Sequence, residues 1–275
     1  MTILDLLLPA FVASLILTGI HAYLGVHVVE RGVIFVDLSL AQIAALGATV
    51  AYLAGYDLHS DAAWLFSLGF TFLGAAVFAL SRVHHRTRIP QEAVIGIVYA
   101  VSAAVAILVM SKATQETEHL KEMLVGNILS VSWNELGKTA ALYAAVGLFH
   151  YLLRKRFLLI SLDPEEAARR GWNVRFWDFL FYVSFGFVVT SSVAMAGVLL
   201  VFCFLIVPAV AAMMFSERLG ARLAFGWILG AVVSAGGVAL SFVLDLPTGA
   251  TIVATFGLAL ALLAGIRPLV RRAAA

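Results

Sequence analysis

The chain has 275 residues, of which 63% are hydrophobic and 12% charged, and its mean hydropathy is +1.02. Soluble domains contain about 45–50% apolar residues, so this composition excludes a soluble domain and predicts an all-α polytopic membrane protein. The net charge of +2 does not indicate a nucleic-acid partner. Cys203 is the single cysteine, which excludes an internal disulfide and a cluster of thiolate metal ligands.

Apolar segments long enough to cross a lipid bilayer recur along the whole chain, since a spanning helix needs about 20 mostly apolar residues. We expect about nine spans in a single membrane domain over residues 1–275. They are predicted at residues 5–26, 35–55, 62–81, 91–111, 136–153, 176–190, 193–215, 222–243 and 249–266. Residues 176–215 are too long for one span, so we expect the chain to fold back at Thr190, Ser191 and Ser192.

The positions of the basic residues predict the orientation in the membrane. If the first span begins outside, 15 of the 18 lysines and arginines fall in segments that face the cytoplasm. Only Lys112, Lys121 and Lys138 then fall outside. Because short cytoplasmic loops are enriched in basic residues, we expect an external N-terminus and a cytoplasmic C-terminus.

Polar side chains within the first two predicted spans are candidates for a transport pathway, because polar groups in a membrane are costly and are commonly functional. His21 lies in the cytoplasmic half of the first span, and Asp37 and Gln42 lie near the start of the second. Imidazole and carboxylate ligands suit Zn²⁺, Mn²⁺ or Fe²⁺. The structural alternative is that Asp37 caps a helix and that His21 bonds to a neighbouring helix.

The longest predicted external segment, residues 112–135, is a candidate gate or docking surface for a protein that delivers substrate. Its candidate residues are Glu116, Glu118, His119 and Glu122. Their spacing is not that of a metal site. The alternative is a charged face that is solvated by water and has no specific partner.

Residues 163–171 form a short hydrophilic segment between two predicted spans and have the sequence of a capped helix. An N-capping residue and a proline begin the segment, two glutamates follow, and two arginines and a glycine end it. The residues are Asp163, Pro164, Glu165, Glu166, Ala167, Arg169, Arg170 and Gly171. A rigid, charged, cytoplasmic helix predicts a docking element for a soluble partner.

Pro208 lies inside the span predicted at residues 193–215. Proline removes one backbone hydrogen bond from a helix, so a kink is expected there. Such a kink serves either as a hinge of a gate or simply as a bend.

Four stretches, in this order and at this spacing, resemble the membrane subunits of ABC importers of the zinc- and manganese-type family. They are Gly32-Val33-Ile34-Phe35-Val36-Asp37 leading through Ala41-Gln42 to Gly47, Glu92-Ala93-Val94-Ile95-Gly96-Ile97, Val198-Leu199-Leu200-Val201 through Ile206-Val207-Pro208-Ala209-Val210-Ala211-Ala212, and Asp245-Leu246-Pro247-Thr248-Gly249. The segment at 163–171 resembles the coupling element that such subunits insert into their ATPase partner.

The resemblance implies an importer of divalent metal ions in the plasma (inner) membrane of a prokaryote. It would contain two copies of this chain, two separate ATP-binding subunits and an external metal-binding protein. The chain itself would bind no cofactor and would not be an enzyme, because ATP is bound and hydrolysed by the partner subunit. Many family members carry a histidine four residues after the aspartate that matches Asp37. Here Ala41 and the poorer ligand Gln42 stand there, which leaves the identity of the metal open.

Two other classes of protein are weighed against this expectation. A secondary transporter or channel for a cation or small solute would need no ATPase, but it predicts several ionisable residues near the bilayer centre, and the chain has almost none there. An intramembrane enzyme needs a nucleophile beside a base. Glu92, His150, Asp178 and Cys203 are instead scattered over different spans.

Overall fold

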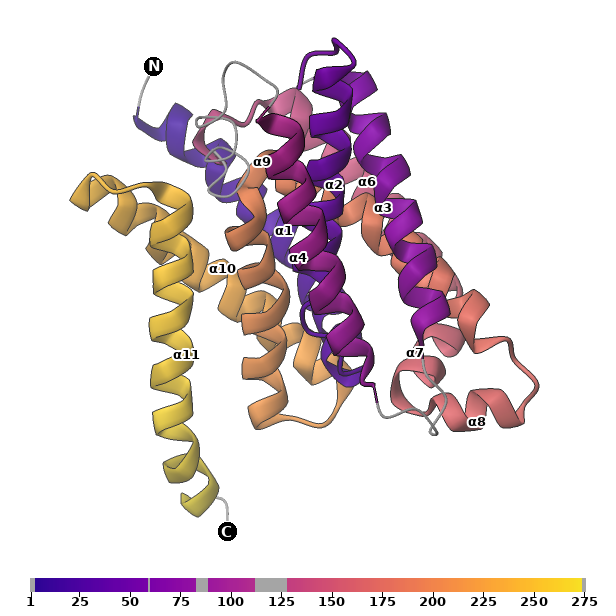
Figure 1. Cartoon of the computed structure of the whole chain (residues 1–275). Helices are drawn as coiled ribbons and strands as arrows, with labels where there is room; N and C mark the ends of the chain where they lie inside the picture. Colours follow the sequence, from indigo (N-terminus) through magenta and orange to yellow (C-terminus); the bar gives the residue numbers. More distant parts are fainter. Residues whose placement is uncertain (1–2, 59, 83–88, 112–127, 274–275) are drawn as a thin grey trace. The chain divides into compact units, whose positions relative to one another are not determined.

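The structure is a computed structural model that describes residues 3–58, 60–82, 89–111 and 128–273, and all regular structure in these ranges is helical (Figure 1). The helices are α1 (Ile3–Glu30), α2 (Val36–Leu53), α3 (Asp61–Ser81), α4 (Gln91–Met110), the 3-10 helix η1 (Ile128–Ser130), α6 (Trp133–Leu152), α7 (Arg154–Leu162), α8 (Pro164–Arg169), α9 (Val174–Phe215), α10 (Leu219–Leu244) and α11 (Thr248–Ala273).

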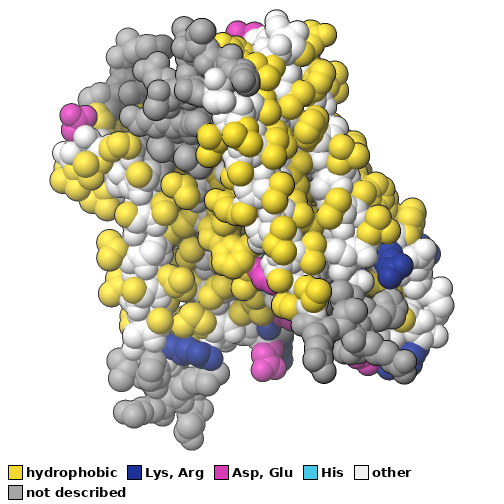
Figure 2. All heavy atoms as spheres, viewed as in Figure 1, with side chains coloured by type: hydrophobic (Ala, Val, Ile, Leu, Met, Phe, Trp, Pro, Cys, Tyr) yellow, Lys and Arg dark blue, Asp and Glu magenta, His cyan; other side chains and the backbone are white. Residues whose placement is uncertain are grey.

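Seven of the described helices are long and apolar enough to cross a membrane. The number is eight if α6 and α7, which bend by 75° at their junction, form one span. The visible face of the molecule is largely covered by hydrophobic side chains (Figure 2), and Leu73 and Leu108 on α3 and α4 are about two-thirds exposed. A polytopic, all-helical membrane protein is thereby confirmed for the described part of the chain.

The interruption of α9 lies elsewhere than predicted. Thr190, Ser191 and Ser192 are helical. The hydroxyls of Ser191 and Ser192 donate to backbone carbonyls one turn earlier, at 2.9 Å and 2.6 Å, so they are satisfied within the helix. The backbone instead leaves the helical conformation at Gly197, with φ 75° and ψ 162°. This region of backbone space is essentially restricted to glycine, because a Cβ would clash there.

The described helices belong to two compact units. The first unit comprises Met1–Val29, Leu124–Ala144 and Met195–Ala275. Within it, α10 packs against α11, and the Trp227 indole N–H donates to the carbonyl oxygen of Gly19 on α1 at 2.9 Å. Pro208 lies within α9, where the backbone remains helical.

The second unit comprises Glu30–Met123 and Ala145–Ala194. In it, α2 packs against both α3 and α4. Gly47 permits the close approach of α3, because a Cβ there would lie 2.7 Å from the Phe66 carbonyl oxygen and the Ser67 Cα. The hydroxyls of Thr71 on α3 and Thr190 on α9 lie 3.2 Å apart. The amino-terminal part of α9 is thereby joined to α3.

Candidate functional site

Asp37 lies within the first turn of α2 and is 1% exposed. Its Oδ1 atom has no hydrogen-bond partner among the described residues. The N-cap position belongs to Phe35, so the alternative in which Asp37 caps the helix is wrong. Since a buried carboxylate oxygen without a partner costs free energy, this oxygen is available to a proton or a cation.

The rest of α2 offers Asp37 no second strong metal ligand on its own face. Leu40 and Ala41 follow Asp37 by three and four residues and therefore lie on the same side of the helix. Gln42, also buried, follows by five residues and points elsewhere around the axis. Nowhere in the described ranges do three or more His, Cys, Asp or Glu residues gather as a metal site.

His21 belongs to α1 in the first unit, whereas Asp37 and Gln42 belong to the second unit. The His21 side chain is buried, and its Nδ1 atom lies 2.7 Å from the carbonyl oxygen of Leu17 in the same helix. Its ring also meets the Tyr143 ring edge to face, with centroids 6.2 Å apart. The Nδ1 contact thus lies within α1, and the ring contact joins His21 to the neighbouring helix α6.

The four candidate docking residues Glu116, Glu118, His119 and Glu122 lie outside the described residues, and so does most of the predicted external segment. The described end of that segment leads into α6. At the start of α6, the Glu135 Oε2 atom accepts from both the backbone N–H and the hydroxyl of Ser132.

The predicted capped helix on the polar segment is confirmed as α8. The Asp163 carboxylate accepts from the Glu166 backbone N–H at 2.9 Å, and Pro164 occupies the first helical position. At the other end, Gly171 has φ 76°, and its N–H donates to Ala168. Trp172 N–H donates to the Ala167 carbonyl, which completes a Schellman motif.

Charged pairs lie on the exposed side of α8. Glu166 Oε2 accepts from Arg169 Nε at 2.9 Å, and its Oε1 accepts from Arg170 Nε at 2.8 Å. These hydrogen bonds, that to Arg170 first and that to Arg169 second, lower the pKa of Glu166. Because the pairs are exposed to solvent, they contribute little to stability, and the caps are the main local support of the helix.

Two large apolar side chains flank α8 and are exposed. Leu162, just before the helix, is 60% exposed, and Phe176, in the first turn of α9, is 52% exposed. Ala167, by contrast, is fully buried and anchors the inner side of α8. The element thus has one side fixed to its unit and a charged side with apolar flanks left open.

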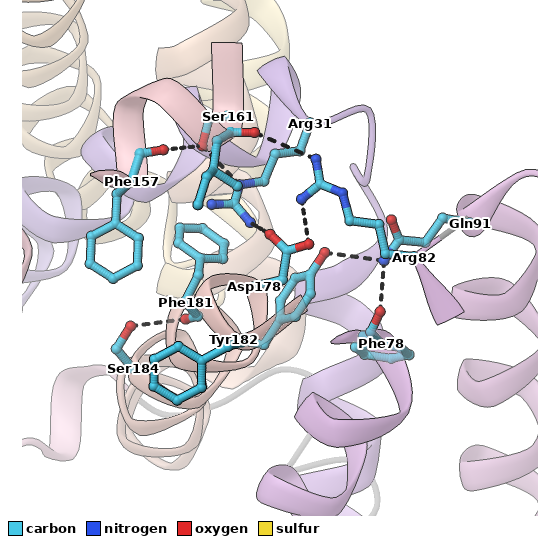
Figure 3. A network of polar contacts seen from close by, with 12 residues as sticks. Arg31, Phe78, Arg82, Gln91, Phe157, Ser161, Asp178, Phe181, Tyr182 and Ser184 are labelled. Carbon is cyan, nitrogen blue, oxygen red and sulfur yellow. Dashed lines mark hydrogen bonds and ion pairs between the residues drawn. The ribbon is translucent and has the colours of Figure 1, made fainter. Parts of the chain in front are cut away.

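The second unit contains a cluster of buried charges that the sequence pattern does not predict, because Asp178 is far from its partners along the chain. Asp178 on α9 is completely buried, and it binds a different arginine with each carboxylate oxygen (Figure 3). Arg31 Nη1 donates to Oδ1 at 2.6 Å, and Arg82 Nη1 donates to Oδ2. One signal in the sequence points to this cluster. It is a lone carboxylate at the edge of an apolar segment, together with arginines at the ends of two other spans.

The same cluster reaches α7, which directly precedes α8. Arg31 Nε donates to the Ser161 hydroxyl at 2.8 Å, and Arg82 Nη2 donates to the Ile160 carbonyl at 3.4 Å. On the opposite side, Gln91 of α4 donates to the Phe78 carbonyl at 2.9 Å and to the Tyr182 hydroxyl at 3.3 Å. Figure 3 shows these side chains converging from separate helices.

Comparison with known proteins extends over nearly the whole chain. The model of the ABC 3 transport family matches residues 3–266. The manganese transport system membrane protein MntC of Listeria monocytogenes is 27% identical over 244 residues, which cover 89% of this chain and 84% of that protein. A Haemophilus influenzae protein named "Probable iron transport system membrane protein" is 30% identical over 244 residues, 89% of this chain and 87% of its own.

The fold is shared with solved structures. PsaBC from Streptococcus pneumoniae, solved in complex with a Fab, superposes with a TM-score of 0.77 at 22% sequence identity. The superposition covers 93% of this chain and 90% of the matched chain. The two chains thus share a fold over most of their length.

Proposed function

The chain belongs to the ABC 3 transport family, and on this premise we propose that it is the membrane permease subunit of an ATP-driven importer of a divalent transition-metal ion. The observation that carries the proposal is the family match over residues 3–266, together with relatives named for manganese and iron transport. Manganese and iron are therefore candidate substrates, and zinc is added by the resemblance of the sequence to zinc- and manganese-type importers. The protein would reside in the plasma (inner) membrane of a prokaryote.

Asp37 is proposed to contact the metal ion during its passage. Support comes from the burial of its carboxylate and from its Oδ1 atom, which has no partner among the residues that the structure describes, since divalent cations favour oxygen and nitrogen ligands. A single carboxylate binds an ion weakly, and weak binding suits a transport step in which the ion must leave again. Gln42 and His21 are proposed as further polar contacts along the pathway.

The membrane topology is proposed to comprise nine spans within one permease domain. Eight spans result when α6 and α7 are counted as one, and the interruption of α9 at Gly197 divides that long helix into two. An external N-terminus and a cytoplasmic C-terminus agree with the excess of basic residues in the segments then facing the cytoplasm. In this orientation α8 is cytoplasmic.

The α8 helix is proposed to couple this chain to a separate ATP-binding subunit. Its caps, its charged side and its exposed flanks Leu162 and Phe176 support a docking role. Two copies of the chain and two ATPase subunits would form the importer. The transporter would alternate between inward- and outward-open states, and ATP would favour one state through its differential affinity for the two.

Two further assignments belong to the same proposal. The external segment at residues 112–135 would receive an extracytoplasmic metal-binding protein. Pro208, where the backbone is helical in this structure, would serve as a hinge in the carboxyl-terminal part of α9, because proline removes one backbone hydrogen bond there.

Reconstitution tests this function directly. The chain is purified with its ATPase partner, inserted into lipid vesicles and supplied with the metal-binding protein, and uptake of Mn²⁺, Zn²⁺ and Fe²⁺ is measured with and without ATP. We expect uptake that depends on ATP hydrolysis. Uptake driven by a proton gradient without the ATPase would instead favour a secondary transporter.

A further inference from the structure

The Asp178 cluster has the geometry of a three-way junction. One buried carboxylate joins Arg31, in the loop between α1 and α2, to Arg82, at the carboxyl end of α3. Replacing a buried ion pair with packed apolar side chains often leaves stability unchanged or raises it. Arg31 also leaves its Nη2 atom buried and unpaired within the described residues. The arrangement is therefore poorly explained by stability alone.

The first arm of the junction is the end of α7. Ser161 lies two residues before Asp163, the N-cap of α8, and its hydroxyl accepts from Arg31 while donating to the Phe157 carbonyl at 2.9 Å. Arg82 adds a bond to Ile160 in the same turn. A displacement of α8 therefore acts on Arg31 through two intervening residues and on Arg82 through three.

The second arm is the start of α2. Arg31 is followed by Gly32 in the left-handed conformation, with φ 67°, and by a tight turn in which Val36 N–H donates to the Val33 carbonyl at 3.1 Å. Phe35 N–H donates to Glu92 Oε1 of α4 at 2.9 Å. This short, bonded loop joins Arg31 to the helix that bears Asp37.

The ring of Phe181 fixes the guanidinium between these arms. The Arg31 guanidinium carbon lies 3.9 Å from the centroid of that ring, which is within the range of a cation–π interaction. A side chain held on one face by a ring and on its edge by a carboxylate has little freedom of its own. When one of the elements bonded to Arg31 moves, the Arg31 side chain is therefore expected to move with it.

We propose that Arg31, held by Asp178, is a positioning residue that transmits movement of the α7–α8 element to the start of α2. Arg82 would hold the same element against α3. This inference rests on the proposed role of α8 in docking the ATPase. It adds the route by which the docked element reaches the helix of the proposed metal contact.

The test uses the reconstituted complex with its ATPase and compares metal uptake per ATP hydrolysed. Ser161→Ala removes only the hydroxyl that links Arg31 to α7 and leaves the Arg31–Asp178 pair in place. We expect the ratio to fall by about tenfold, the scale of one hydrogen bond to a charged group, while binding of the ATPase and the rate of hydrolysis persist. Ser161→Thr retains a hydroxyl and should restore the ratio. Arg175→Met, at an exposed arginine near the start of α9, is the matched control and should leave it unchanged.

A second readout follows the movement itself. Cys203 is buried, so a cysteine introduced as Phe35→Cys, at a half-exposed position, can be labelled selectively. With Ser161 intact, its labelling rate should differ between the nucleotide-free complex and the complex trapped with a nonhydrolysable ATP analogue. With Ser161→Ala added, we expect that difference to shrink.

The outcomes separate this inference from the function on which it rests. An unchanged uptake ratio and an unchanged labelling difference in Ser161→Ala would overturn the inference, even if variants of α8 abolish coupling. If variants of α8 have no effect on ATPase binding or uptake, the docking role itself fails. A parallel loss of insertion, ATPase binding and hydrolysis in Asp178→Asn, with a normal ratio in Ser161→Ala, would reduce the cluster to a structural support.

Discussion

The caps of α8 offer the sharpest test of the docking role, because the Asp163 carboxylate and the Gly171 backbone bond to residues of α8 itself. The helix has six residues, and isolated helices of this length are marginal in water. Asp163→Ala removes the bond to the Glu166 N–H and should cost about 0.5–2 kcal/mol. Gly171→Ala places a Cβ at φ 76° and should cost about 1–2 kcal/mol.

These energies convert into a predicted loss of partner affinity. A protein that binds only through its formed helix loses apparent affinity in proportion to the population of that helix. In a variant whose free α8 is mostly unformed, the whole energy appears as lost affinity. Asp163→Ala should then weaken binding of the ATPase by about twofold to thirtyfold, and Gly171→Ala by about fivefold to thirtyfold. Asp163→Asn and Gly171→Asn are matched controls, because asparagine is a good N-cap and tolerates the left-handed conformation.

The assay titrates detergent-solubilised protein with the purified ATPase subunit and measures the apparent dissociation constant. Membrane insertion and thermal stability are recorded for each variant, and both should stay close to those of the unmodified chain. The double variant Asp163→Ala/Gly171→Ala should bind more weakly than either single variant, and both asparagine variants should bind normally. An unchanged dissociation constant in the double variant would refute the claim that a pre-formed α8 is what the partner recognises.

Three further predictions concern the pathway, the topology and the acid response. Asp37→Ala should lower metal uptake by at least the roughly 10–100-fold that accompanies loss of a metal-site partner, with assembly and basal ATP hydrolysis retained; a parallel loss of assembly would contradict the transport role. Reporter fusions should read as external at Asp57 and cytoplasmic at Arg169, and the opposite readings would invert the topology. Arg170 and Arg169 lower the pKa of Glu166 from 4.5, so its contribution to α8 is complete above that pH and is lost as the pH falls through the lowered pKa. Because these exposed pairs contribute little, the helix should bind its partner only slightly more weakly in acid, and Glu166→Gln should remove that part of the pH dependence.

Local features were the most accessible to sequence reasoning. The whole of α8 follows from neighbouring residues: a capping carboxylate, a proline at the first position and a glycine after the last turn. The apolar spans followed equally well, because bilayer thickness fixes the length of helix required. Both depend on interactions within a few residues, which a single sequence displays directly.

The interruption of α9 shows where such local reasoning fails. Three consecutive hydroxyl residues at 190–192 predict a turn, yet the hydroxyls of Ser191 and Ser192 donate to carbonyls within the helix. A lone glycine five residues later carries the change of direction of the backbone. Polarity alone does not break a membrane helix when each hydroxyl can reach a carbonyl one turn earlier. The positive φ at Gly197 is the stronger constraint.

The Asp178 cluster depends on residues that no local pattern connects. Arg31 and Asp178 are 147 positions apart, and each by itself has an ordinary explanation, the arginine as a topology signal and the aspartate as a helix-terminal charge. A carboxylate buried beside the membrane is nonetheless costly unless it is paired. Its presence within an apolar segment therefore demands a cationic partner from another span. Only two of the arginines at the ends of spans meet that demand in the described structure, and both also bond to the helix that leads into α8. Arg31, paired with this one buried charge, thus connects the helix before the proposed docking element to the loop before the helix of Asp37.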